Sequence, residues 1–130
     1  MPALEDLREQ RKEFRPHPTS PAGARRFVAE VLDGSSWSES TPVLVLLTSE
    51  LVTNAVVHAE TPVDVIVRSS PERVRVEVVD GSTRAPLRRL ARGDDEWGRG
   101  LGVVESLSSR WGVQCAEWGK SVWFELDAVS

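Results

Sequence analysis

The feature that most constrains the fold is an apolar segment, residues 42–59, that carries three polar side chains on one stripe. Thr41-Pro42 is a helix start signal, because Thr is a favoured N-cap and Pro a favoured first helical residue. Apolar residues occupy nearly every side of this helix, so it should lie at the centre of the fold. Glu50, Asn54 and His58 recur every four residues and therefore share one side of it.

The polar stripe is interpreted as the wall of a pocket or as a partly exposed helix edge. The rest of the helix is too apolar for a comfortable solvent face, and a buried charge needs a partner, a metal or a ligand. Asn54 offers a neutral carbonyl oxygen to a hard cation, and Glu50 can take a proton or orient a hydroxyl or a water. His58 stands at the C-terminal end of the helix, where capping of free carbonyl groups is a stronger expectation than catalysis.

The segments on either side of this helix predict a further helix and a hairpin. Ser20-Pro21 repeats the helix start signal, and apolar residues follow at helical spacing over residues 24–32. Val63, Val65 and Val67 alternate with Asp64 and Arg68. Val74, Val76 and Val78 alternate with Arg75 and Glu77, which predicts an antiparallel hairpin closed by the turn 69–72.

The second half of the chain predicts a lid, a third helix and a second hairpin. Residues 82–97 show no clear period and are interpreted as a loop that is either disordered or a functional lid. The glycine-rich segment 98–102 should form a turn that opens the third helix, which is expected to end near Trp111-Gly112. Gly119-Lys120 suits a two-residue type II′ turn. The strands around it are expected at residues 113–118 and 121–126.

Together these elements predict one domain of the α/β class. We expect a two-layer sandwich in which a mixed, mostly antiparallel sheet of about five strands carries three helices on one face. The 130 residues suffice for one hydrophobic core and are too few for two ordinary domains. Residues 1–16 are expected to form a flexible N-terminus with an edge strand at 13–16, and residues 17–128 the single domain.

Composition excludes several classes of function. The net charge of -4 argues against a general nucleic-acid or anionic-membrane footprint. The single cysteine, Cys115, excludes an internal disulfide and a cysteine-rich zinc site, which fits a reducing cytoplasm. The first fourteen residues are interrupted by charges and resemble neither a signal peptide nor a membrane span. We therefore expect a cytoplasmic protein.

Two further motifs are weak separately and gain force in combination with the stripe. Asp80 has the parity of the apolar residues of its strand, so its carboxylate should point to the helix-covered face and accept an amine such as that of adenine. The alternating glycines of residues 98–102 would let backbone N–H groups approach an anion at a helix start. A Rossmann interpretation fails, because the glycines follow a charged loop rather than the first strand of a βαβ unit.

The order of these motifs resembles the Bergerat-fold ATP-binding superfamily, which includes DNA gyrase, mismatch-repair ATPases, heat-shock chaperones and histidine kinases. Residues 50–55 look like its N box, residues 78–81 like its first glycine box and residues 98–102 like its second. The chain is most similar to the single-domain bacterial anti-sigma-factor serine/threonine kinases and their ATP-binding relatives. The resemblance covers residues 18–126, including Trp111-Gly112 and the C-terminal segment that begins at Gly119.

The resemblance implies a role for each motif residue. Glu50 would be the catalytic residue that orients and deprotonates the attacking hydroxyl, and Asn54 would coordinate Mg²⁺. The residues expected to contact ATP are Asn54, Asp80, Gly81, Gly98, Arg99, Gly100, Leu101, Gly102 and Ser121. One departure concerns the first glycine box, usually Asp-x-Gly-x-Gly, in which Ser82 and Arg84 replace the two later glycines.

The implied function is that of an ATP-binding anti-sigma regulator that phosphorylates a serine or threonine of an anti-anti-sigma partner. Its partners would be an anti-anti-sigma protein, a sigma factor or both, without nucleic acid or membrane, and a homodimer is left open. The alternative is a non-catalytic module in which ATP organises a surface that binds a sigma factor or another signalling partner. A histidine-kinase catalytic domain is disfavoured, because the chain has no room for a dimerisation helix pair with a phospho-accepting histidine.

Overall fold

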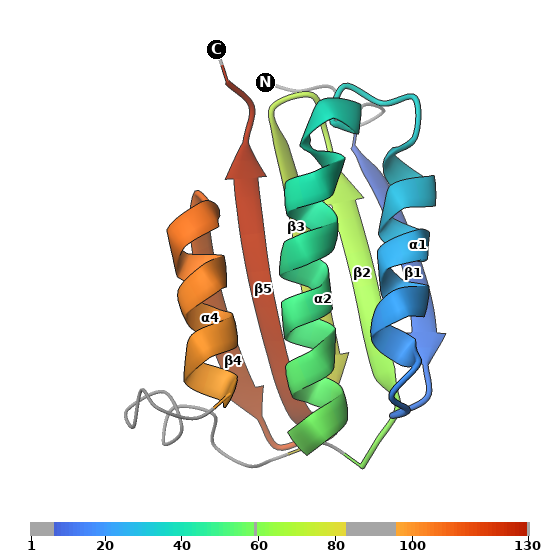
Figure 1. Ribbon diagram of the computed structural model, residues 1–130, viewed down its shortest axis with the longest axis vertical. Helices are drawn as coiled ribbons and strands as arrows, with labels where there is room; N and C mark the ends of the chain where they lie inside the picture. The colour runs from blue at the N-terminus through green and yellow to red at the C-terminus, as the bar shows by residue number, and fades with distance from the viewer. Residues whose placement is uncertain (1–6, 59, 83–95, 130) are drawn as a thin grey trace.

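The computed structural model describes residues 7–58, 60–82 and 96–129, and it has two layers, a sheet and a set of helices on one of its faces (Figure 1). The strands are ordered β1-β2-β3-β5-β4, and all neighbouring strands are antiparallel. The predicted two-layer sandwich with three α-helices is confirmed, and the sheet is antiparallel throughout the strands described rather than mixed. The elements are β1 (Arg8–Phe14), α1 (Ser20–Leu32), the 3₁₀ helix η2 (Ser38–Ser40), α2 (Thr41–His58), β2 (Val63–Ser69), β3 (Arg73–Asp80), α4 (Glu96–Leu107), β4 (Arg110–Ala116) and β5 (Gly119–Asp127).

Helix α2 is the central helix, as its apolar circumference predicts. It lies between α1 and α4 over the middle of the sheet (Figure 1). Its inner leucines join the alternate valines of β2 and β3 in one buried cluster, which confirms the predicted hairpin and its parity. Residues Ser38–Val57 are long and apolar enough to cross a membrane, with a mean hydropathy of 1.4. The core helix of a globular domain passes the same test, and here the inner side of α2 forms the core.

The edge strand β1 runs from Arg8 to Phe14, so it begins before the predicted residues 13–16 and occupies much of the expected flexible N-terminus. Its side chains are exposed except for that of Phe14, which is partly buried, and therefore no alternating pattern marks it. The strand is held by antiparallel pairing of its whole length with β2 and by ion pairs such as Arg11 with Asp64. Backbone pairing of this kind leaves little trace in the sequence.

Helix α4 starts at Glu96 and ends at Leu107, so the glycine segment lies inside the helix and not in a turn before it. Glycine costs about 1 kcal/mol relative to alanine in a helix, which is why the sequence favoured a turn. The helix forms nonetheless, because Leu101 and Val104, one turn apart, are both buried in the core. The predicted lid overlaps this helix at 96–97, and its residues 83–95 lie outside the described part of the chain.

The predicted end of the third helix at Trp111-Gly112 is wrong, because both residues belong to β4. Gly112 lies opposite Trp123 of β5, and a Cβ on Gly112 would approach the Trp123 ring to 2.6 Å. Glycine is therefore needed here to give the indole room on the sheet, a packing requirement that resembles a helix-ending signal in the sequence.

The C-terminal hairpin turns at Glu117-Trp118, not at the predicted Gly119-Lys120. Ala116 pairs with Gly119, which places Gly119 and Lys120 inside β5. Gly119 has a φ of +143°, and a Cβ on it would lie 2.1 Å from the backbone oxygen of Asp80. The glycine is required by close contact with the end of β3, and a turn is not its reason.

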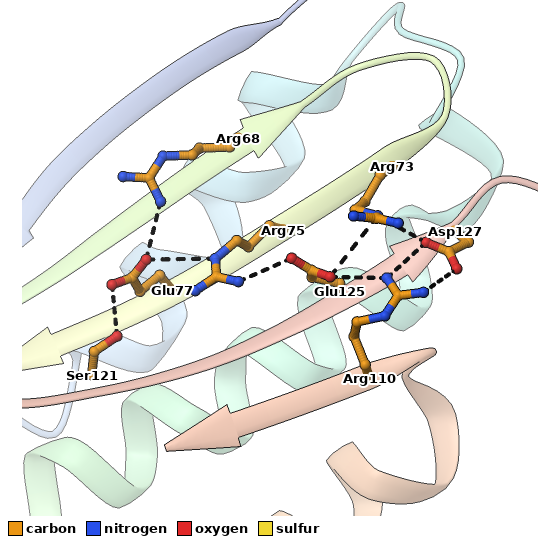
Figure 2. A network of polar contacts seen from close by, with 8 residues as sticks. All are labelled: Arg68, Arg73, Arg75, Glu77, Arg110, Ser121, Glu125 and Asp127. Carbon is orange, nitrogen blue, oxygen red and sulfur yellow. Dashed lines mark hydrogen bonds and ion pairs between the residues drawn. The ribbon is translucent and has the colours of Figure 1, made fainter. Parts of the chain in front are cut away.

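The face of the sheet opposite the helices carries a network of ion pairs (Figure 2). Near its middle, the Arg75 guanidinium lies between the carboxylates of Glu77, at 3.6 Å, and Glu125, at 2.9 Å. The same guanidinium stacks over the Trp123 ring at 4.1 Å from its centroid. The drawn members of the network are Arg68, Arg73, Arg75, Glu77, Arg110, Ser121, Glu125 and Asp127.

These contacts lower the pKa values of the carboxyl groups. Burial alone would raise the pKa of Glu77, but the hydrogen bond from Ser121 and the charge of Arg75 lower it below its ordinary value. At the end of β5, hydrogen bonds from Arg110 lower the pKa of Asp127 to about 2. Ionised carboxylates therefore hold this face together, and its side chains stabilise the pairing of the strands.

Candidate functional site

A small cavity lies under the C-terminal half of α2, where the ends of β3 and β5 meet. Polar and apolar side chains from these three elements line it closely, and in this conformation the space between them is too narrow for a water molecule. The first residues of α4 lie at the same end of the molecule (Figure 1). The lining residues are Leu51, Asn54, Ala55, Val78, Asp80, Lys120 and Val122.

Asp80 occupies the position that its parity in β3 predicts. It is the last residue of the strand, it is buried, and its side chain lines the cavity on the helix-covered side. Its Oδ1 accepts a hydrogen bond from the Ser82 backbone N–H at 2.7 Å. The backbone N–H of Gly81 donates to the Thr61 hydroxyl at 2.8 Å, which fixes the chain just after the strand. Thr61 is thus a positioning residue that the sequence did not reveal.

Asn54 lies in the same cavity, one helical turn beyond Glu50. Its side chain is buried, and its Nδ2 has no hydrogen-bond partner among the residues described. A buried polar group without a partner costs about 1–3 kcal/mol, so such a group in a cavity wall points to a ligand. Because the amide can turn over, either its nitrogen or its oxygen can face that ligand.

Glu50 differs from Asn54 in its surroundings, although both were predicted on one stripe. It is only partly buried and does not line the cavity, and α2 turns an exposed side to solvent at the nearby Leu46 and Val57. The stripe therefore runs from a solvent-facing rim at Glu50 to the buried wall at Asn54. His58 is the last residue of α2, as its predicted place at the C-terminal end requires, and its side chain lies outside the described part.

The glycine segment contributes its backbone to α4 and not to the cavity lining. The backbones of Gly98, Arg99 and Gly100 are helical, and the side chain of Arg99 lies outside the described part. Leu101 is buried in the core, so its side chain is a packing residue. Gly102 is exposed, and a Cβ on it would meet no described residue within 4 Å. The fold brings this helix beside α2, while a contact with a ligand stays a prediction.

The structure places Ser121 away from the cavity and Lys120 in it. Ser121 points to the helix-free face, where its hydroxyl donates to Glu77 at 2.6 Å (Figure 2). Ser121 therefore does not line the cavity, and its predicted contact with a ligand finds no support in this placement. Lys120, one residue earlier, has the opposite parity and lies across from Asp80 in the sheet. The sequence prediction placed Lys120 in a turn, where side chains do not alternate between the two faces of a sheet. It therefore missed that Lys120 shares a face with Asp80.

A buried strand-end carboxylate, an unpartnered helix amide and a neighbouring glycine-rich helix thus belong to one end of the sandwich. The family model for the histidine kinase-like ATPase domain matches residues 14–126. The chain therefore belongs to this family, which supports the resemblance to the Bergerat-fold ATPases. No curated protein matches the chain closely enough to count as a relative.

Proposed function

We propose that the chain is an ATP-dependent regulator that transfers the γ-phosphate of ATP to a serine or threonine of an anti-anti-sigma partner. The observation that carries this proposal is the cavity under α2, in which the Asp80 carboxylate and the unpartnered Asn54 amide lie together among apolar side chains. A flat base with an exocyclic amine suits the chemistry of this lining, because the apolar side chains can cover its faces and the carboxylate can accept from its amine. The family match supports ATP as the ligand.

The side chain of Asn54 offers an oxygen that fits Mg²⁺. No group of three or more His, Cys, Asp or Glu that could hold a metal occurs among the residues described. Mg²⁺ commonly takes one or two protein oxygens and completes its shell with phosphate and water oxygens, so the Asn54 amide oxygen is a sufficient protein ligand. The bound ion would neutralise charge on the phosphates. Arg99 and the backbone amides at the start of α4 would complete the phosphate contacts.

Glu50 suits the role of the residue that prepares the attacking hydroxyl. It lies one turn from Asn54 and outside the cavity, at the partly exposed rim that a partner protein can reach. Its carboxylate would take the proton of the hydroxyl as the oxygen bonds to the γ-phosphorus. The bond from that phosphorus to the bridging oxygen breaks, and ADP leaves.

A second candidate function is a binding module without transfer. The observation in its favour is the altered first glycine box, with Ser82 and Arg84 in place of glycine, together with a lysine ammonium beside Asp80 inside the base cavity. In that module, ATP would hold a partner-binding surface in place. Sigma factors and other signalling proteins are the partner class that the resemblance suggests.

Two variants of α2 separate the two functions. Asn54→Ala should weaken Mg-ATP binding and abolish transfer together, because the metal ligand is lost. Glu50→Gln should leave ATP affinity within a few-fold and lower the transfer rate by roughly a hundredfold or more, the scale of a lost general base. Calorimetry gives the affinities, and incubation with Mg-ATP and each candidate anti-anti-sigma protein gives the rates. A parent that binds ATP and phosphorylates no partner would favour the binding module.

A further inference from the structure

The cavity holds a buried ion pair that the motifs do not anticipate. The Lys120 ammonium lies 3.0 Å from Oδ2 and 3.1 Å from Oδ1 of Asp80, and the two side chains are 3% and 1% exposed. An ion pair this deep is costly to desolvate, so its retention in a small core calls for a role beyond stability. Both side chains line the cavity from the sheet side, facing Asn54 and Leu51 of α2.

Asp80 and Lys120 do not use all of their hydrogen-bonding capacity on each other and on the backbone. Asp80 Oδ1 already accepts hydrogen bonds from the Ser82 backbone N–H and from Lys120, whereas Oδ2 lies 3.0 Å from the Lys120 ammonium in the ion pair. A carboxylate oxygen can accept two hydrogen bonds, so Oδ1 is filled and Oδ2 keeps free accepting capacity. The ammonium has three N–H donors, and its contacts with described residues are those with the two Asp80 oxygens. One acceptor and at least one donor therefore remain side by side.

The remaining acceptor and donor match one edge of adenine. That edge presents a single amine donor, N6, beside a single ring acceptor, N1. Guanine presents the O6 acceptor beside the N1–H donor and so matches the pair in part, but its adjacent N2–H is a further donor that needs an acceptor of its own. The apolar side chains of Ala55, Val78 and Val122 around the pair make an unmatched polar group expensive, which sharpens the choice between bases.

We infer that Lys120 is a second base-reading residue, which donates to N1 of adenine while Asp80 accepts from the N6 amine. This inference rests on the proposed ATP-binding function and adds a specificity-determining contact to it. In this arrangement the ion pair stays intact when the nucleotide binds, because the base uses only the positions that the pair leaves free. A lysine that merely blocked the cavity would instead have to leave Asp80 before ATP could enter.

The test compares nucleotides that differ at one ring atom, in the full chain. Binding of ATP, 1-deaza-ATP and 7-deaza-ATP is measured by calorimetry with Mg²⁺ present. Replacement of N1 by C–H removes the acceptor, and the parent should bind 1-deaza-ATP about ten- to a hundredfold more weakly than ATP, the scale of a hydrogen bond to a charged donor. The 7-deaza compound alters the other side of the ring and should bind as ATP does.

Variants at the two lysines of the chain assign the effect to Lys120. Lys120→Met should bind ATP and 1-deaza-ATP equally, whereas the exposed control Lys12→Met should discriminate between them as the parent does. Circular dichroism checks the fold of each variant, and if Lys120→Met does not fold, the comparison in the parent decides alone.

Three results would overturn the inference. Equal binding of ATP and 1-deaza-ATP by the parent would show that N1 is not read. Tighter binding of both nucleotides by Lys120→Met would show a blocking lysine. A parent that binds none of the three nucleotides would overturn the proposed function as well, and this outcome differs from the first two because no binding is seen at all.

Discussion

Removal of one charge from the Lys120–Asp80 pair should destabilise the fold far more than removal of both. At 3.0 Å and an effective dielectric constant of about 20, the attraction between the two charges is about 5–6 kcal/mol. The desolvation of the two ions costs several kcal/mol each and offsets this attraction, so the net contribution of the pair is small. In Asp80→Asn, the desolvation of the Lys120 ammonium remains while most of the attraction is lost. We expect a loss of about 3–5 kcal/mol in the free energy of unfolding.

The double variant Asp80→Asn with Lys120→Met should recover most of this loss. Methionine keeps much of the volume of the lysine stem without its charge, so the double variant should unfold within about 1–2 kcal/mol of the parent. Urea denaturation followed by tryptophan fluorescence measures all three free energies. The control is Asp64→Asn, which breaks the Arg11–Asp64 pair, with side chains 59% and 22% exposed, and should cost far less because water screens a surface pair.

The reasoning is refuted if Asp80→Asn costs no more than Asp64→Asn. That result would mean that the Lys120 ammonium reaches water once its partner is neutral, so it is not confined to the cavity. A double variant as unstable as the single one would also contradict the account, because it would locate the loss in the Asp80 position and not in an uncompensated lysine charge.

Three further outcomes follow from individual contacts. Gly119→Ala should destabilise the fold more than Gly34→Ala in urea unfolding. Both glycines have a positive φ, but only a Cβ on Gly119 would clash with backbone atoms. A Cβ on Gly34 would meet no described residue, so Gly34→Ala should cost about 1 kcal/mol. Gly102→Ala should be as stable as the parent or up to about 1 kcal/mol more stable, since no described residue lies near its Cβ. A fall in ATP affinity in calorimetry would then assign its backbone to the ligand. The ionised Asp127 carboxylate should stabilise the fold fully above pH 3.8, its ordinary pKa, and this stabilisation should be lost as the pH falls toward its folded pKa of about 2. The free energies of unfolding of the parent and of Asp127→Asn should therefore differ at pH 6 and converge near pH 2.

The hairpin, the central helix and the two-layer class could be predicted because each rests on hydrophobic periodicity. The alternate valines of β2 and β3 are buried in the order that period two requires, and Asp80 follows their parity into the cavity. The same rule could not find β1, whose six exposed residues are held by backbone pairing and surface charges. Where pairing replaces burial, hydrophobic periodicity carries no information.

Glycine was the main source of error, because several physical demands lead to the same residue. Gly112 makes room for the Trp123 ring and Gly119 for the end of β3, whereas a Cβ on Gly102 would meet none of the described residues. In the sequence, all three looked like local signals for a helix end, a turn or a phosphate loop. The space around each glycine shows which of these reasons applies, and that space depends on residues far away in the sequence.

The register of β3 against β5 determines both the stability and the chemistry of the site. Because Asp80 pairs with Lys120 and Val79 with Ser121, the lysine shares the helix-covered face with Asp80 while the serine joins the opposite network. A slip of one residue would exchange the two and leave a hydroxyl beside Asp80 in place of the ammonium. The φ of Gly119, which only glycine adopts without strain, holds that register at the point where the strands begin to pair. The base-reading pair is therefore a consequence of one backbone contact, between Gly119 and the carbonyl of Asp80.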